Sequence, residues 1–229
     1  MQLYFTPQGN DGIINGTCYK PSGVERFGIA MGKLFILIGK SASGKDSVYK
    51  RLLEDPSLGL VPYVGFTTRP IRSGELDGRE YHFVTWEKLR EYEESGRLIE
   101  KRVYHTVHGD WCYFSVDTEY VDLSRHDYLY IGTLESYLPL RSYYGEDRVI
   151  PVYLQVDDGI RLKRALEREM SQESPKYAEM CRRFLGDEED FSEERLAQAG
   201  ISRRFDNTQF DTCIQQICEY IRQWQRSEE

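Results

Sequence analysis

The sequence predicts an α/β fold in which a parallel sheet carries helices on both faces. The apolar run 34–38 has the length and composition of a buried parallel strand, and residues 48–53 after it have helical spacing. Two more apolar runs, 127–132 and 149–156, read as core strands that each precede a helix. Buried strands that alternate with helices are typical of a parallel α/β sheet.

Composition is that of one globular unit with a sizeable core. The 229 residues are 40% hydrophobic and 30% charged. A formal net charge of −8 argues against a general nucleic-acid-binding surface, because phosphate backbones are bound by clustered Lys and Arg. We therefore expect small-molecule ligands and no nucleic-acid partner.

Cysteine usage and hydropathy predict a cytoplasmic protein. The five cysteines are scattered and form no C-x-x-C pair, so neither a disulfide framework nor a zinc site is indicated. No apolar run approaches the roughly 18 residues of a membrane span. The first thirty residues also lack the regions of a signal peptide.

A glycine-rich loop, residues 39–46 with the sequence G-K-S-A-S-G-K-D, joins the first strand to its helix. Strand, glycine turn and helix form the context that a phosphate-binding loop requires. Gly39 and Gly44 let the backbone N–H groups turn toward phosphate oxygens, and Lys45 adds a cation at the helix N-terminus. We expect this loop to hold a nucleoside triphosphate through Gly39, Lys40, Ser41, Ala42, Ser43, Gly44, Lys45, Asp46 and Ser47.

One position departs from the phosphate-loop motif. The motif has Ser or Thr after the lysine, where the hydroxyl binds Mg²⁺, but this chain has Asp46, followed by Ser47.

A second motif lies in residues 67–84. Arg69 and Arg72 flank Pro70 and precede a glycine turn, so both guanidinium groups can converge on one phosphate. On spacing alone, a solvated charged turn explains the pattern equally well.

The second motif gives the chain a resemblance to guanylate kinases. Its sequence T-T-R-P-x-R-x-G-E-x-D-G-x-x-Y-x-F-V resembles that family's acceptor-binding signature, at the expected distance after the loop. The resemblance covers roughly residues 33–222. It implies a P-loop nucleoside monophosphate kinase fold and transfer of the γ-phosphoryl group of ATP to GMP, giving ADP and GDP with the help of Mg²⁺.

The resemblance also assigns acceptor-binding residues. It implies that Arg69, Arg72, Tyr81 and Tyr113 hold the phosphate of GMP. Glu100 matches the carboxylate that accepts from guanine N1–H and its amino group, and Ser115 becomes a candidate contact to guanine O6.

An arginine-rich segment resembles the lid of these kinases. Arg164, Arg168 and Arg183 match arginines that close over the triphosphate, where they would neutralise the charge that develops during transfer. The alternative is that this basic helix pairs with its own glutamates, Glu167, Glu169 and Glu179. Asn207, with Asp206, matches the loop that contacts the donor adenine.

Three departures weaken the base and metal assignments. Gly65 stands where the family usually has a serine that touches guanine. Tyr130 and Gly132 replace an acidic pair at the end of a strand near the metal. We therefore expect Asp46 to supply the metal carboxylate, with Glu135 as a second possible donor that reads better as an exposed helix-start residue.

Two smaller patterns have structural explanations. His105 and His108 lie in an apparent insertion, and we interpret them as solvated loop residues rather than metal ligands. Asp157 and Asp158 could form a metal pair, but capping of the helix that follows is the better interpretation.

The domain organisation follows from these motifs. We predict a P-loop core from 31–66, 126–160 and 191–229, an acceptor-binding insertion at 67–125 and a lid at 161–190. Residues 1–30 are an extension, either disordered or docked as a hairpin, and the protein is expected to be a monomer or homodimer.

Two other functions stay open: a kinase for a different (deoxy)nucleotide or small phosphorylated acceptor, and a catalytically silent binding module.

Overall fold

A five-stranded parallel sheet forms the centre of the molecule. The computed structural model describes residues 32–106 and 109–226, so the predicted extension at residues 1–30 and His108 lie outside the described part. The strands are β1 (Leu34–Gly39), β2 (Leu60–Pro62), β7 (Asp127–Ile131), β8 (Val149–Gln155) and β9 (Arg204–Asp206). Their order is β2-β7-β1-β8-β9, which confirms the predicted parallel α/β core.

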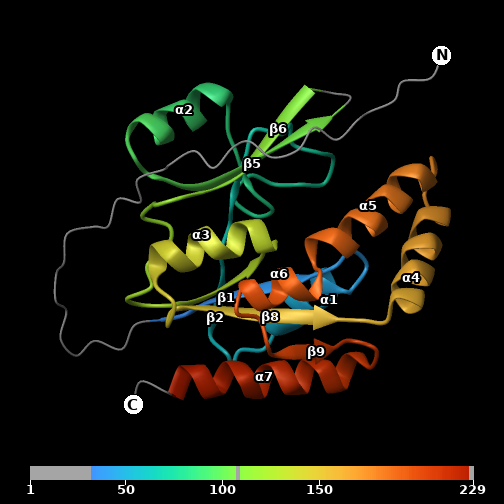
Figure 1. The fold of residues 1–229 in the computed structure, drawn as a ribbon. Coiled ribbons are helices and arrows are strands. Elements are labelled where there is room, and N and C mark those ends of the chain that lie inside the picture. The colour runs from blue at the N-terminus through green and yellow to red at the C-terminus, as the bar shows by residue number, and fades with distance from the viewer. Residues whose placement is uncertain (1–31, 107–108, 227–229) are drawn as a thin grey trace.

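Helices cover both faces of this sheet. One face packs against α1 (Lys45–Leu53) and α7 (Phe210–Arg226), and the other against α3 (Leu134–Tyr144) and α6 (Glu193–Gln198) (Figure 1). Side chains of β1 alternate between the faces: Leu34 and Ile36 pack toward α3, whereas Phe35 and Leu37 pack toward α1 and α7. Because both faces are covered, β1 reads as a continuous apolar run.

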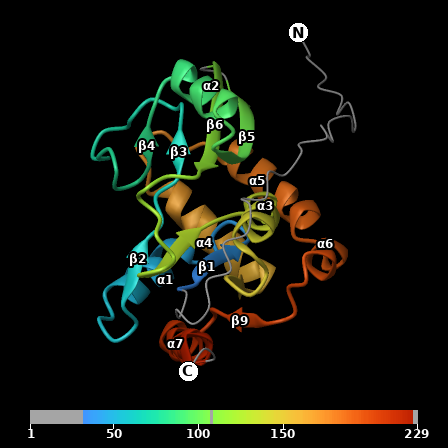
Figure 2. The same cartoon turned by 90° about the vertical axis from the view of Figure 1, so that its left-hand side faces the viewer.

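A second, smaller sheet lies on the α3 side of the core. It contains β3 (Phe66–Thr67), β4 (His82–Phe83), β5 (Leu98–Thr106) and β6 (Gly109–Val116) in the order β4-β3-β6-β5. The helix α2 (Trp86–Glu94) closes its own small core through Leu89, which packs with Phe66 and Phe114. Figure 2 shows this sheet and α2 at one end of the molecule and α7 at the other.

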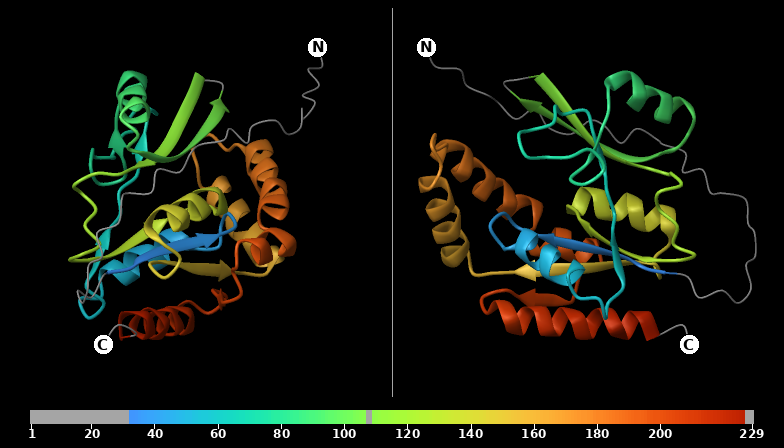
Figure 3. Two further views of the ribbon diagram at one scale, coloured as in Figure 1. Left: turned by 60° about the vertical axis from the view of Figure 1, so that its left-hand side comes forward. Right: turned by 180° about the vertical axis from the view of Figure 1, so that it is seen from behind.

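A helical hairpin follows the carboxyl end of β8. It consists of α4 (Asp158–Met170) and α5 (Tyr177–Asp190), and Figure 3 shows it standing away from the core sheet. The carboxylate of Asp157 accepts from the Ile160 N–H at 3.2 Å, which confirms the predicted helix cap. Glu135 is an exposed residue in the first turn of α3, as expected from its sequence position.

The prediction of a loop around His105 was wrong. His105 lies in β5, where it is paired with Asp110 of β6, and its Nδ1 is 2.7 Å from the Asp110 carboxylate. The two strands continue as one long antiparallel hairpin, which turns the apparent insertion into regular structure. Among the described residues, no helix is both long and apolar enough to cross a lipid bilayer.

Replacing Gly132 with alanine should lower the stability of the fold. An added Cβ would lie 2.7 Å from Ile36 Cγ2 and 2.9 Å from Ser136 Oγ, inside the packed junction of β7 and α3. We expect Gly132→Ala to reduce the free energy of unfolding by about 1–3 kcal/mol, measured by urea denaturation.

Gly186 supplies the matched control. It lies within α5, and an added Cβ there meets no atom within 4 Å. Gly186→Ala should leave stability unchanged or raise it by up to about 1 kcal/mol, because alanine favours a helix. Equal effects of the two substitutions would contradict the packing argument.

Candidate active site

The glycine loop between β1 and α1 is held tightly against the sheet. A Cβ on Gly39 would lie 2.7 Å from the Leu154 carbonyl oxygen, so the loop can approach β8 only with glycine there. Gly44 has a φ of 90° and Ala42 a φ of 59°, and both turn the backbone toward the start of α1. The ammonium of Lys45 donates to the carbonyls of Gly39 at 2.6 Å and Lys40 at 3.0 Å.

Burial lowers the pKa of Lys45 to about 8, although the nearby carboxylates of Asp187 and Asp46 act to raise it. A lowered lysine pKa is expected where the ammonium lies in a partly desolvated site that binds an anionic ligand. Asp46 itself is exposed in the first turn of α1.

Asn207 is hydrogen-bonded to the same loop. Its Nδ2 donates to the Ser43 carbonyl at 2.8 Å, and its own carbonyl accepts from Arg164 at 3.1 Å. Asn207 is 2% exposed, so its observed role is to link the loop to α4. Contact with the donor adenine stays a prediction for Asn207.

The hairpin of α4 and α5 reaches the loop through residues that the sequence motifs did not single out. The Asp187 carboxylate of α5 accepts from the Ser41 N–H at 2.8 Å. Arg161 of α4 is 1% exposed and donates to Asp158 at 3.0 Å and to the Ser41 carbonyl at 3.3 Å. Arg161 was visible in the sequence only as one of several lid arginines, and Asp187 only as part of an acidic segment.

The three predicted lid arginines do not meet at one point. Arg164 contacts the Asn207 carbonyl, Arg168 is exposed, and Arg183 donates to Glu179 on its own helix at 2.8 Å. The pairing of Arg183 agrees with the alternative interpretation of a helix that neutralises its own surface charge. Closure of these arginines over a triphosphate stays a prediction.

Arg69 lies at the centre of the second motif. Its side chain is 3% exposed, and it forms two hydrogen bonds of 2.9 Å with the Glu75 carboxylate. Arg69 Nε is buried and, in the described part of the chain, has no hydrogen-bond partner. An unsatisfied buried guanidinium N–H is costly, which makes it a good position for an anionic ligand.

Aromatic side chains surround Arg69. The Tyr81 ring centroid is 5.6 Å from its guanidinium carbon, and the Tyr81 and Tyr113 rings are 5.4 Å apart. Burial raises the pKa of Tyr81 to about 12, so this phenol stays a neutral hydrogen-bond donor. The hydrogen bond from Arg69 holds the pKa of Glu75 at about 2. Arg72 is exposed, and its guanidinium carbon lies 5.8 Å from the Trp111 ring centroid.

The predicted base-binding residues lie side by side in the second sheet. Glu100 of β5 is 7% exposed, and the fully buried Ser115 of β6 donates its hydroxyl proton to Glu100 Oε1 at 2.8 Å. Arg102, which the sequence analysis did not select, forms an ion pair with Glu100 at 3.0 Å. The hydroxyl proton of Ser115 is thus already used within the protein.

At the end of β7, Tyr130 and Gly132 occupy the positions where an acidic pair was expected. Tyr130 is 7% exposed, and its hydroxyl oxygen lies 3.5 Å from the position of an added Cβ on Gly65. Gly132 has no room for a side chain, as described above. Tyrosine therefore fills the space beside Gly65, and the structure leaves no place for a carboxylate at position 132.

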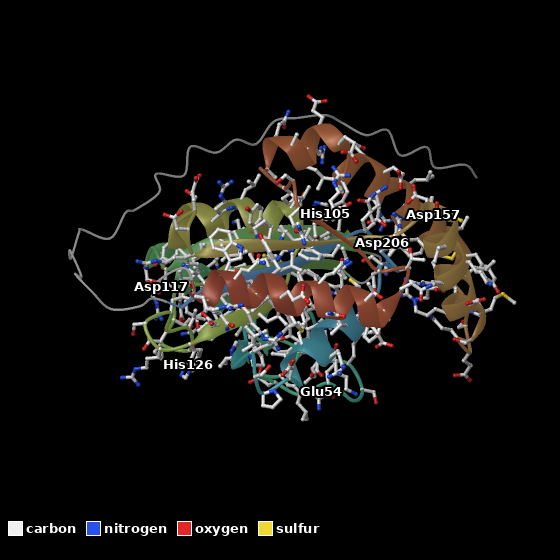
Figure 4. The ribbon with its side chains drawn as sticks, turned by 90° about the horizontal axis from the view of Figure 1, so that it is seen from below. Glu54, His105, Asp117, His126, Asp157 and Asp206 are labelled. Atoms are coloured by element: carbon white, nitrogen blue, oxygen red, sulfur yellow. The ribbon has the colours of Figure 1, made fainter. Side chains whose placement is uncertain are left out.

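The carboxyl ends of the parallel strands share one edge of the sheet. Figure 4 shows Asp157 and Asp206, which end or follow β8 and β9, on one side of the molecule, with Asp117 and His126 on the other. A cavity of about 280 Å³ beside Lys40 lies at this edge, lined by Asp157, Asp158, Arg161, Glu193 and Arg204 among others. Across 32–106 and 109–226, no three His, Cys, Asp or Glu side chains form a group that could hold a metal by themselves.

Sequence comparison finds both motifs within one matched segment. The family model for guanylate kinase matches residues 31–111. The chain is 27% identical to the guanylate kinase of Porphyromonas gingivalis over 197 residues, which are 85% of this chain and 98% of that protein. The chain is similar to guanylate kinases over most of its length.

Other guanylate kinases agree with this placement. The Thermotoga maritima protein is 28% identical over 83% of this chain and 78% of its own length. A guanylate kinase of Rhodopseudomonas palustris is 41% identical, but over 86 residues that span only 37% of its length. The crystal structure of guanylate kinase from Anaplasma phagocytophilum shares the fold, with a TM-score of 0.58 at 19% identity over 86% of this chain and 88% of the other.

The pKa of Lys45 predicts how ATP binding to this protein depends on pH. Below its pKa of about 8 the ammonium is charged and attracts the triphosphate, and the charge is lost as pH rises through that value. Above pH 8, the dissociation constant for ATP should rise up to about tenfold per pH unit, measured by calorimetry from pH 7.5 to 9.5. The Lys45→Met variant should bind weakly with a flat profile, and a wild-type profile equally flat would exclude this titration.

Proposed function

We propose that the protein transfers the γ-phosphoryl group of ATP to GMP, giving ADP and GDP. One observation carries the proposal: the chain has a loop built for phosphate around Lys45 and, separately, a buried Arg69 whose Nε lacks a partner in the described residues. A phosphotransferase needs one anion site for its donor and another for its acceptor. The names of its relatives supply the identity of the acceptor.

Positioning and electrostatics carry the proposed reaction. The loop amides and Lys45 hold the donor phosphates, and Arg69, Tyr81 and Tyr113 hold the acceptor phosphate. No general base is required, because a monophosphate oxygen is already anionic at neutral pH. The lid arginines Arg164, Arg168 and Arg183 neutralise charge that spreads over the transferring group.

Mg²⁺ would accompany ATP in this proposal, and it would supply positive charge against the donor phosphates. The exposed carboxylate of Asp46 lies in the first turn of α1, directly after Lys45, so its chemistry and position suit a ligand that would hold the ion directly or through water. Gly132 cannot be replaced by a carboxylate without a clash, which supports the assignment to Asp46.

We place the reaction in the cytoplasm, where both nucleotides occur. The cysteines of the described residues, Cys112, Cys181, Cys213 and Cys218, are all free, which supports a reducing compartment.

The proposal predicts ADP release that depends on GMP. Lys45→Met and Arg69→Met should each lower kcat/KM by about 10²–10³, because each removes a charge aimed at a phosphate. A coupled ADP-release assay measures this. Arg90→Met is the control and should keep wild-type activity, since Arg90 is exposed and its side chain bonds only to Glu87 within the described part of the chain.

The metal assignment predicts a distinct phenotype for Asp46→Asn. The variant should need about tenfold more Mg²⁺ for half-maximal activity, while its affinity for metal-free ATP stays equal or rises as a negative charge is lost. A Mg²⁺ titration of the same assay measures this. An unchanged Mg²⁺ requirement would show that another group holds the ion.

The assay also separates the two other functions. Turnover with a different monophosphate but not with GMP would identify another acceptor. Folded protein that binds ATP and turns over no acceptor would be a binding module.

A further inference from the structure

The base-binding carboxylate of the second sheet is already engaged by protein groups. Arg102 Nε donates to Glu100 Oε2 at 3.0 Å, and Arg102 Nη2 donates to Oε1 at 3.3 Å. The Ser115 hydroxyl donates to the same Oε1 at 2.8 Å. Glu100 is 7% exposed and Ser115 is fully buried, so these contacts are not a solvated surface pair.

Residues of the core sheet hold the Arg102 guanidinium in this position. Its Nη1 donates to Thr133 Oγ1 at 3.3 Å, and its Nη2 donates to the Tyr130 hydroxyl at 3.4 Å. Thr133 caps α3 and Tyr130 belongs to β7, so Arg102 bridges the second sheet and the core. A guanidinium that is bound on both sides cannot turn away from Glu100 without losing several hydrogen bonds at once.

The hydrogen-bonding capacity of Glu100 is therefore nearly used up. An ionised carboxylate offers about four acceptor positions, two on each oxygen. Arg102 and Ser115 together take both positions on Oε1, and Arg102 takes one on Oε2. One position remains, on Oε2.

The number of free acceptor positions on Glu100 decides which base edge can bind to it. Guanine presents two adjacent donors there, N1–H and its 2-amino group, and would use one acceptor on each carboxylate oxygen. Hypoxanthine lacks the amino group and presents N1–H alone. Adenine presents an unprotonated N1, which would face the carboxylate without a proton.

We propose that Arg102 sets the base specificity of the acceptor site, so that 6-oxopurine monophosphates bind without selection for the 2-amino group. GMP and IMP are then comparable acceptors, and AMP is excluded. The inference rests on the proposed function, because it assigns the substrate class of that acceptor site. It makes Arg102 a positioning residue that acts through Glu100.

The test compares kcat/KM for GMP, IMP and AMP in wild type and in Arg102→Lys. In wild type, the kcat/KM values for GMP and IMP should agree within about threefold, and the value for AMP should be at least about 100-fold lower. Lysine keeps the charge but replaces the fork with a single ammonium, which frees a position on Glu100. The preference for GMP over IMP should then rise about tenfold, the effect of one hydrogen bond to a charged group.

Two further variants keep the result interpretable. Arg102→Met should shift the ratio in the same direction as Arg102→Lys, with thermal unfolding used to confirm that it is folded. Lys101→Met is the matched control: Lys101 neighbours Arg102 in β5, but it is exposed and pairs with Glu93, so the ratio should not change.

Failure of this inference differs from failure of the proposed function. A wild-type preference for GMP over IMP above tenfold, or a ratio that stays the same in folded Arg102→Lys, would overturn the role of Arg102 while leaving the kinase reaction intact. If no purine monophosphate is turned over, calorimetric binding of GMP and IMP still decides the point. Equal affinities support it, and unequal affinities or no binding of either nucleotide refute it.

Discussion

The close approach of the glycine loop to the core sheet is the constraint on which the rest of the site depends. Gly39 leaves no space for a side chain against the Leu154 carbonyl, and Asn207, which follows β9, donates a hydrogen bond to the Ser43 carbonyl. These contacts fix where the amides at the start of α1 point and where Lys45 can reach. Every other predicted ligand-binding residue matters only in relation to that point, because a phosphoryl group must travel from it to an acceptor.

Charged side chains of α4 and α5 pair with groups of the glycine loop and with one another. The carboxylate of Asp187 accepts from a loop amide, Lys40 pairs with Glu188, and Arg161 joins the loop carbonyl to both lid acids. Charged contacts thus link the α4–α5 hairpin to the loop. Such contacts weaken with salt and with competing anions.

The acceptor side is organised differently, around buried charge pairs. Two ion pairs lie there, Arg69 with Glu75 and Arg102 with Glu100. In each pair, at least one side chain is almost fully buried. A buried pair adds little net stability, but breaking it by removing one partner is costly, so it holds its members in one geometry. In the first pair the Arg69 Nε–H has no protein partner in the described residues; in the second, one acceptor position of the Glu100 carboxylate is left over. The remaining capacity of each pair decides what can bind.

The sequence by itself determined the alternation of strands and helices along the chain, the glycine loop at 39–46, the arginine-containing turn after Thr67 and the cap at Asp157. These features are local, since hydrophobic period, glycine conformation and short spacings are encoded within a few residues. Only the tertiary structure decided that His105 continues a strand, that Arg102 engages Glu100, that Asp187 reaches Ser41, and that Gly132 has no room for a carboxylate. Each of these depends on residues brought together from distant segments or on long pairing between strands, and neither spacing nor composition reports which partners will occupy a charged side chain once the chain has folded.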